Sequence, residues 1–335
     1  MTRSKNILKV CAAAVVLGFA SMSAGAQQQT LYCYTSFKDS MLQQLKAAFE
    51  AKNPTIKLEA QVAGAGKLMA KIAAERESGK ILADMLWTSE VPDFYQLREA
   101  GVLLKYVPKD IKAIYNPIPD YDGSFTPVRL GNLAIAYNTK KIKEPPKSWD
   151  DLKKPAYKGA LGIANPSLSG TAYMAAALLS QEFGWKFFED LRANGAKMGK
   201  GSGQVLDDTA SGDLVACLGV DYMTYDKMSK GANMALAFMP QMLVFPSPIA
   251  IFKDSPNKEA AIKFVDFMLS KEAQQIIADE GTLPVRNDVK INPKFNLPSV
   301  EEAMKRGIKI DYANIMKNKE TNVKTFIDIM QKKKK

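Results

Sequence analysis

The chain has 335 residues, 47% of them hydrophobic and 24% charged, which supplies apolar material for one large domain or two of medium size and excludes a disordered or fibrous protein. It contains no histidine, which excludes Ser-His-Asp and Cys-His nucleophile systems, histidine-containing zinc sites, the two-histidine iron site and any histidine pH switch. The polar groups that remain for chemistry are carboxylates, lysines, tyrosines, hydroxyls and backbone amides.

The first 26 residues have the pattern of a secretory signal. Basic residues at positions 3, 5 and 9 precede an apolar run over residues 7–20, and the small residues 24–26 follow it. We expect the mature chain to start near Gln27 and to be periplasmic. No later stretch approaches ~20 consecutive apolar residues, so we expect the mature chain to be soluble.

Removal of this segment takes away three basic residues and no acidic one, so the formal net charge falls from +11 to +8. The remaining basic residues are spread along the chain, and the dense run at 332–335 is predicted to be a solvated tail. Because no basic helix with interleaved aromatic residues is present, we expect no nucleic-acid partner.

Two cysteines remain in the mature chain, because Cys11 lies inside the signal. Cys33 and Cys217 both lie in apolar segments, which favours buried free thiols. A disulfide between them is the alternative that the sequence leaves open.

Strands and helices alternate from residue 31 onward, which is typical of an α/β protein with mostly parallel sheets. The first series has strands at 31–35 and 56–62, a third strand within 81–90, and helices over 41–49, 68–73 and 94–100. After an irregular stretch, a second series has a strand at 160–165, helices over 172–181 and 185–191, and a strand at 214–220.

Two long apolar stretches, 128–138 and 243–252, are predicted to carry the chain between two lobes. The second contains Pro246 and Pro248, which favour an edge strand or a hinge. We therefore expect an α/β fold of two lobes, each a mostly parallel sheet flanked by helices, with a ligand cleft between them. The predicted boundaries are 27–130 plus 250–290 for lobe 1, 131–249 for lobe 2, and 291–335 for a C-terminal helical segment with the basic tail.

Four turns that follow strands are rich in hydroxyl groups and glycine. Because ligands bind beyond the carboxyl ends of parallel strands, backbone amides and hydroxyls at these turns are candidates for binding an anion. The candidates are Thr35, Ser36, Gly66, Thr88, Ser89, Ser167, Ser169, Gly170 and Thr171. The alternative is that they are ordinary capping and turn residues. The sequence GAGK at 64–67 is not a nucleotide loop, since Leu68 stands where a hydroxyl residue is required.

Three segments carry a family resemblance, and together they span most of the chain from Leu31 to Arg286. They read YNTKKIKEPPKSWDDLKKPAYKGALGIANPSLSGTAY, SGDLVACLGVDYMTYDK, and SPIAIFKDSPNKEAAIKFVDFMLSKEAQQ with GTLPVR. They resemble the extracellular solute-binding proteins of bacterial ABC importers, in the group that binds ferric iron, phosphonates or phosphosugars. The resemblance implies the type II periplasmic-binding-protein fold, capture of a small solute by lobe closure, and delivery to an ABC permease in the inner membrane. We expect a monomer without a cofactor and without enzymatic activity.

The hydroxyl-rich turns favour a phosphonate or phosphate-ester ligand. Asp221 and Tyr222 follow a strand of the second series and are further candidates, with Asp221 meeting an ammonium or sugar hydroxyl of the ligand. In the alternative, Asp221 is turned away and paired with a lysine. Arg129 either pairs with an anionic ligand or bridges the lobes.

Ferric iron is the alternative ligand. Ferric members of this group hold iron with adjacent tyrosines, often with a histidine and a glutamate. Here Tyr222 and Tyr225 are separated by two residues and no histidine exists, so Tyr222 is the metal ligand only if this alternative holds. We interpret Tyr225 as a packing residue.

Two further functions stay open on the same architecture. An enzyme would draw on Asp221, Glu90, Lys67 and Tyr222, although no motif pairs a nucleophile with a base. A periplasmic sensor would present its ligand-bound form to a membrane receptor.

Overall fold

The computed structural model describes residues 28–37 and 39–332. The predicted signal segment 1–26 lies outside these residues, as does most of the basic tail. The strands are β1 (Gln29–Thr35), β2 (Ile56–Val62), β3 (Met85–Trp87), β4 (Thr126–Asn138), β5 (Leu161–Ala164), β6 (Lys197–Gly199), β7 (Ala216–Val220), β8 (Met234–Ala237) and β9 (Leu243–Ile251).

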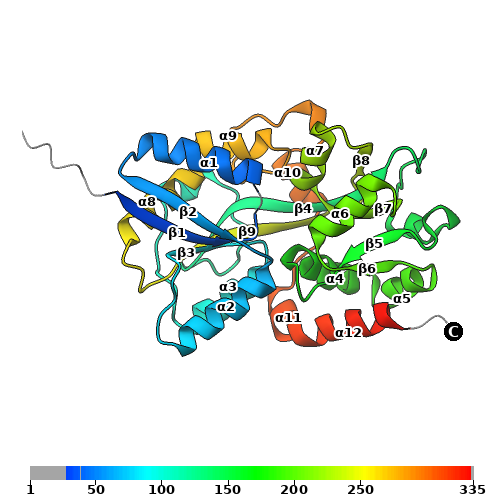
Figure 1. Ribbon diagram of the computed structural model, residues 1–335, viewed down its shortest axis with the longest axis horizontal. Helices are drawn as coiled ribbons and strands as arrows, with labels where there is room; N and C mark the ends of the chain where they lie inside the picture. The colour runs from blue at the N-terminus through cyan, green and yellow to red at the C-terminus, as the bar shows by residue number, and fades with distance from the viewer. Residues whose placement is uncertain (1–27, 38, 333–335) are drawn as a thin grey trace, which may run out of the picture.

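Helices lie on both sides of these strands (Figure 1). They are α1 (Asp39–Lys52), α2 (Ala65–Glu77), α3 (Val91–Glu99), α4 (Gly170–Phe183), α5 (Lys186–Ala193), α6 (Ser202–Ser211), α7 (Asp221–Ser229), α8 (Lys258–Leu269), α9 (Lys271–Asp279), α10 (Val300–Arg306), α11 (Tyr312–Lys317) and α12 (Lys319–Gln331). Within the described residues, no helix is long and apolar enough to cross a membrane.

The strands form a sheet in the order β2-β1-β3-β9-β4-β7-β5-β6, with β8 paired to β4. β1 pairs in parallel with β2 and β3, and β5 pairs in parallel with β6 and β7. The predicted parallel pairing within each series is confirmed. The expectation of a separate sheet in each lobe is wrong, because β4 and β9 pair with each other and join both sets of strands.

β9 lies in the middle of this order, so its prediction as an edge strand is wrong, whereas its prediction as a crossing segment is confirmed. Pro248 faces Pro127 of β4, and the register shifts between Pro127 and Arg129. Proline has no N–H group to donate to a neighbouring strand. The sheet therefore tolerates Pro127 and Pro248 at this point, where the pairing is already irregular.

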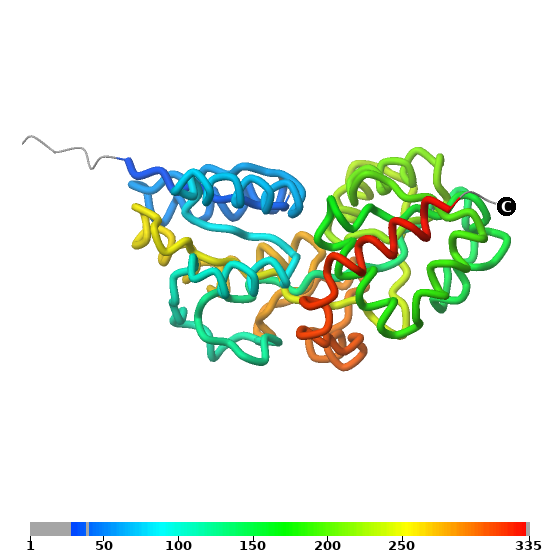
Figure 2. Tube along the Cα trace, turned by 90° about the horizontal axis from the view of Figure 1, so that it is seen from below, coloured from blue at the N-terminus to red at the C-terminus, as the bar shows by residue number. Residues whose placement is uncertain are grey.

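Figure 2 shows two bodies joined by a narrower region. The C-terminal helices contact both of them. α11 packs near α3, whereas α12 lies along α4 and α5, where the rings of Phe326 and Phe188 are 5.1 Å apart. The residue boundaries of the lobes stay a prediction.

The strands of the interior are apolar along nearly their whole length, because helices cover both faces. β4 and β9 are buried at almost every residue. Cys33 and Cys217 are buried free thiols, as predicted. Burial raises the pKa of Cys217 to about 12 and that of Cys33 further, so both thiols stay protonated and unreactive.

Candidate functional site

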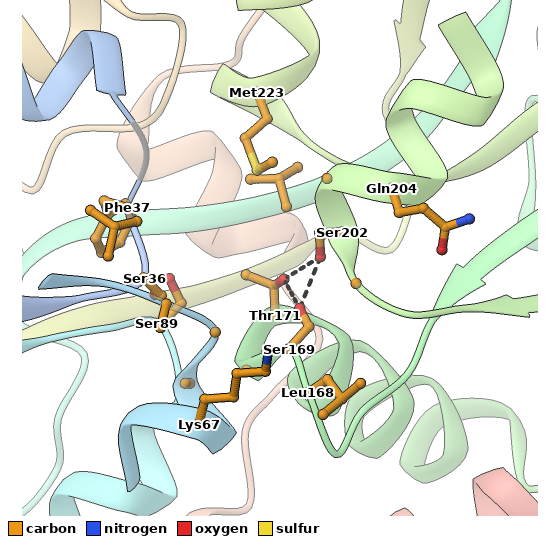
Figure 3. Close-up of a pocket in the computed structure, with 18 of the residues that line it drawn as sticks. Ser36, Phe37, Lys67, Ser89, Leu168, Ser169, Thr171, Ser202, Gln204 and Met223 are labelled. Atoms are coloured by element: carbon orange, nitrogen blue, oxygen red, sulfur yellow. Dashed lines mark hydrogen bonds between the residues drawn. The ribbon is translucent and has the colours of Figure 1, made fainter. Parts of the chain in front are cut away.

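A cavity of about 490 Å³ lies where the first turns of α2, α4, α6 and α7 converge (Figure 3). This volume is typical of small-molecule sites. The lining residues are Ser36, Phe37, Val62, Ala63, Gly64, Ala65, Lys67, Ser89, Arg129, Leu168, Ser169, Gly170, Thr171, Lys200, Gly201, Ser202, Gly203, Gln204, Val220, Tyr222 and Met223. Because free amide N–H groups concentrate at helix N-termini, the convergence of four such ends favours an anion.

Three hydroxyl groups form a closed cluster in this pocket (Figure 3). The Oγ of Ser169 lies 3.0 Å from Oγ1 of Thr171 and 2.9 Å from Oγ of Ser202, and the last two atoms are 3.0 Å apart. Ser169 also caps α4 by accepting from the amide of Ala172. Each hydroxyl can rotate to donate to an incoming oxyanion, so the cluster offers up to three donors without a change in backbone.

The charges of the lining are all positive. Lys67, Lys200 and Arg129 line the pocket, and the lining contains no aspartate or glutamate. Lys67 and Lys200 are exposed, whereas Arg129 is fully buried. Burial lowers the pKa of Arg129, but a guanidinium does not lose its proton in a protein.

Arg129 is held by a polar network behind the pocket. Its Nη1 donates to Oγ1 of Thr282 at 2.9 Å, its Nη2 donates to Oγ of Ser247 at 3.3 Å, and its Nη1 lies 3.6 Å from Oδ1 of Asp221. Its Nε has no hydrogen-bond partner within the described part of the chain. Oγ of Ser89 contacts Oγ of Ser247 at 2.9 Å, which links the network to the pocket.

The structure does not bring Asp221 into the pocket. Its Oδ1 accepts from the amide of Tyr222 at 2.7 Å, and its Oδ2 accepts from Thr282 at 2.7 Å. Burial raises the pKa of Asp221 to about 6, partly offset by the charge of Arg129. The residue is therefore turned away, as one alternative predicted, but its partner is an arginine and not a lysine.

Of the sequence-predicted candidates, the structure brings these to the pocket: Ser36, Ser89, Ser169, Gly170, Thr171, Arg129 and Tyr222. Those that do not line it are Thr35, Gly66, Thr88, Ser167, Asp221 and Tyr225. Oγ1 of Thr35 accepts from the amide of Phe37, and Oγ of Ser167 donates to Asn165. These two hydroxyls have the turn-forming role that was the alternative for every candidate.

The loop at 199–203, with the sequence GKGSG, was not predicted as part of the site. It connects β6 to α6 and places Lys200 and Ser202 in the lining. Its composition matches the other hydroxyl- and glycine-rich turns, and this is the signal that could have identified it. Lys67, which ends the GAGK sequence, also lines the pocket.

Only part of the predicted ferric donor set faces the pocket. Tyr222 lines it, but the hydroxyl of Tyr225 donates to the carbonyl of Phe295, as expected for a packing residue. The described residues contain no group of three or more histidine, cysteine, aspartate or glutamate side chains that could hold a metal ion. The pocket thus offers Fe(III) one phenol and no carboxylate.

Comparison with known proteins places the chain in a family. Residues 82–315 match the model of the family described as bacterial extracellular solute-binding protein. A putative 2-aminoethylphosphonate-binding periplasmic protein of Salmonella typhimurium is 29% identical over 239 residues, covering 68% of each chain.

Two solved structures show the same fold. AfuA of Actinobacillus pleuropneumoniae, with fructose-6-phosphate bound, has a TM-score of 0.78 at 24% identity and covers 91% of this chain and 99% of its own. Iron-bound HitA of Pseudomonas aeruginosa has a TM-score of 0.75 at 24% identity, with 90% and 99% covered. The predicted α/β periplasmic-binding-protein fold is confirmed. The chain belongs to the bacterial extracellular solute-binding proteins, a family whose members bind solutes and are not enzymes.

Proposed function

We propose that this chain is the periplasmic substrate-binding component of an ABC importer, and that it captures a small phosphonate or phosphate-ester anion and delivers it to the permease. The observation that supports this proposal most directly is the composition of the pocket lining. Helix N-termini, hydroxyl groups and three cationic side chains converge there, and no lining residue is an aspartate or glutamate. The Salmonella relative named for a phosphonate and the AfuA structure with a sugar phosphate support this ligand class.

The lining comes from both predicted lobes. The start of α2 belongs to lobe 1, and the starts of α4 and α6 belong to lobe 2. A ligand that contacts both sides stabilises the closed arrangement by contacts that the open one cannot make. Closure on the ligand would therefore both capture the ligand and produce the shape that a permease recognises.

Ferric iron is the second candidate, since Tyr222 lines the pocket. Fe(III) prefers several anionic oxygen ligands, and the lining residues supply one phenol among three cationic side chains. A ferric site would need further anions from solution, which makes it the weaker proposal.

Calorimetric titration of the mature chain with phosphonates, phosphate esters and ferric citrate tests the proposal. We expect micromolar or tighter binding of at least one phosphorus compound, recovered unchanged after release. Ser169→Leu should abolish this binding in a protein that still folds, with a melting temperature lowered by only a few degrees through loss of the α4 cap. Ser167→Ala, in the same loop but outside the lining, should bind as the parent does. Binding of ferric citrate alone would contradict the proposal, as would conversion of the ligand to a product.

A further inference from the structure

We propose that the pocket takes a phosphonate or phosphate ester whose organic part carries no ammonium group, so that the chain discriminates against aminoalkyl phosphonates. This inference rests on the proposed function and narrows its substrate class. It distinguishes the ligand of this chain from 2-aminoethylphosphonate, the compound for which the Salmonella relative is named.

The charge of the lining disfavours an ammonium group on the ligand. Lys67, Lys200 and Arg129 line the cavity, and no lining residue is acidic. The ammonium groups of Lys67 and Lys200 form no salt bridge to any described residue, so their charges are not neutralised at the pocket mouth. Arg129 is paired with Asp221, so the unpaired positive charge comes from the two lysines. A substrate ammonium placed beside them gains no attraction and meets repulsion, whereas a dianion is attracted.

The acidic residues next to the lining, Asp221 and Glu90, are paired within the protein. Asp221 lies between Val220 and Tyr222, but both of its oxygens accept hydrogen bonds and Arg129 is 3.6 Å away. Glu90 follows Ser89, and its Oε1 lies 2.6 Å from Nζ of Lys319. Lys319 is shared between Glu90 and Asp93, so each of the two carboxylates next to the lining has a cation of the protein as its partner, and neither lines the pocket.

Aromatic side chains can bind ammonium groups through the faces of their rings. The ring of Phe37 stacks on Trp87 at 4.2 Å, and the guanidinium of Arg129 lies 4.7 Å from its centroid. Arg129 is also 5.0 Å from the ring centroid of Tyr222. The protein's own cation thus lies over one face of each ring, and Trp87 stacks against Phe37 as well.

The pocket therefore has one end suited to an oxyanion and another suited to uncharged carbon. Figure 3 shows Phe37 across the pocket from the cluster of Ser169, Thr171 and Ser202, with Met223 on a third side. The accessible apolar surface of the lining comes from Val62, Leu168 and Met223, whereas Phe37 is almost fully buried. An alkyl or aromatic substituent fits there without a buried and unpaired charge.

Two ligand pairs of equal size test the inference, because an ammonium and a methyl group have similar volumes. The pairs are 2-aminoethylphosphonate with propylphosphonate, and 2-aminoethyl phosphate with propyl phosphate. In calorimetric titration at pH 7, we expect at least one pair to bind. Within that pair, the methyl compound should bind at least about tenfold more tightly than the amino compound. Equal or tighter binding of the amino compound would overturn the inference and leave the proposed function standing. Binding of none of the four, nor of any other phosphorus compound, would contradict the proposed function itself.

A gain-of-function variant gives the same test independently. Met223→Glu adds a carboxylate to the lining, whereas Met223→Gln adds the same shape without the charge. We expect the glutamate variant to shift the affinity ratio toward the amino compound by at least about tenfold, and the glutamine variant to leave the ratio within about twofold of the parent. Melting curves verify that both variants fold. An unchanged ratio in the folded glutamate variant would show that the charge of the lining does not select the ligand.

Discussion

Gly64 and Leu168 touch across the pocket through their main chains, since a Cβ atom on residue 64 would lie 2.3 Å from the carbonyl oxygen of Leu168. Gly66 has the same relationship to the carbonyl oxygen of Ser167, also at 2.3 Å. Gly64 and Gly66 lie at the start of α2, and Ser167 and Leu168 lie in the loop before α4, so the contact joins the two predicted lobes beside the ligand cavity. Neither glycine has a positive φ, so close approach, and not backbone conformation, requires glycine here.

Gly66→Ala should prevent this approach and weaken ligand binding. The added Cβ meets backbone, which cannot move aside as a side chain does, so the two loops must separate. We expect at least a tenfold loss of affinity by calorimetry, with the melting temperature of the unliganded protein changed little. Ala70→Ser, at an exposed position of α2, is the control and should bind normally. Parental affinity in Gly66→Ala would show that closure does not depend on the contact.

Thr171→Val should weaken binding because it removes one donor of the hydroxyl cluster while keeping the volume of the side chain. A hydrogen bond to a charged group contributes about 1.5–3 kcal/mol, which corresponds to a loss of roughly 10- to 100-fold in affinity. Thr171→Ser keeps the hydroxyl and should retain affinity within a few-fold. Equal affinities of the valine and serine variants would exclude Thr171 as a ligand donor.

Arg129→Met should destabilise the fold as well as the site. It leaves Asp221 buried without its cation, and breaking a buried pair in this way costs about 3–5 kcal/mol. Urea denaturation followed by tryptophan fluorescence measures this loss. The double variant Arg129→Met with Asp221→Asn should recover part of it, because no unpaired charge then remains. If the two losses simply add, the residues are not coupled in the manner that their geometry indicates.

The stability of the unliganded protein should fall as the pH rises from 5 to 7.5, by at least about 1 kcal/mol. Burial raises the pKa of Asp221 to about 6. Burial, together with the charge of Glu90, raises the pKa of Asp93 well above its usual range, against the opposing effect of Lys319. In this window the folded protein therefore holds protons that the unfolded chain, with carboxyl pKa values near 4, has released. The fold is more stable while these groups are protonated, and that stability is lost as they ionise.

The absence of histidine makes this pH dependence measurable, because no imidazole titrates between pH 5 and 7.5. The unfolding free energy at several pH values, obtained from urea titrations, gives the slope. Asp93→Asn and Asp221→Asn should each reduce it, and the double variant should be nearly flat. A parental profile that is already flat, or that rises with pH, would contradict the assignment.

The positions of the loops around the pocket could be predicted from the sequence because they depend on local patterns. Continuous apolar runs predict buried strands, and a parallel strand must be followed by a turn and a helix on the same edge of the sheet. Ser36, Ser89 and the residues 169–171 were predicted in this way and line the pocket. The loop at 199–203 escaped prediction because β6 has only three residues, none of them buried, and so has no hydrophobic pattern.

The direction of individual side chains did not follow from the sequence. Asp221 and Tyr225 lie in α7, close to Tyr222, yet neither lines the pocket and Tyr222 does. The rotation of α7 about its axis is set by groups remote in the chain, since Asp221 is held by Thr282 and Tyr225 by the carbonyl of Phe295. No local pattern contains such contacts.

The sequence by itself determined the alternation of strands and helices, the two crossing segments and the hydroxyl-rich turns, because these depend on the order of apolar and small polar residues along the chain. Only the tertiary structure decided the charge of the pocket. Asp221 is paired with Arg129, 92 positions away in the sequence, and Glu90 is paired with Lys319, 229 positions away. These partners meet only when the two halves of the sheet and the C-terminal helix pack together, so no local pattern could show that the two carboxylates are paired within the protein.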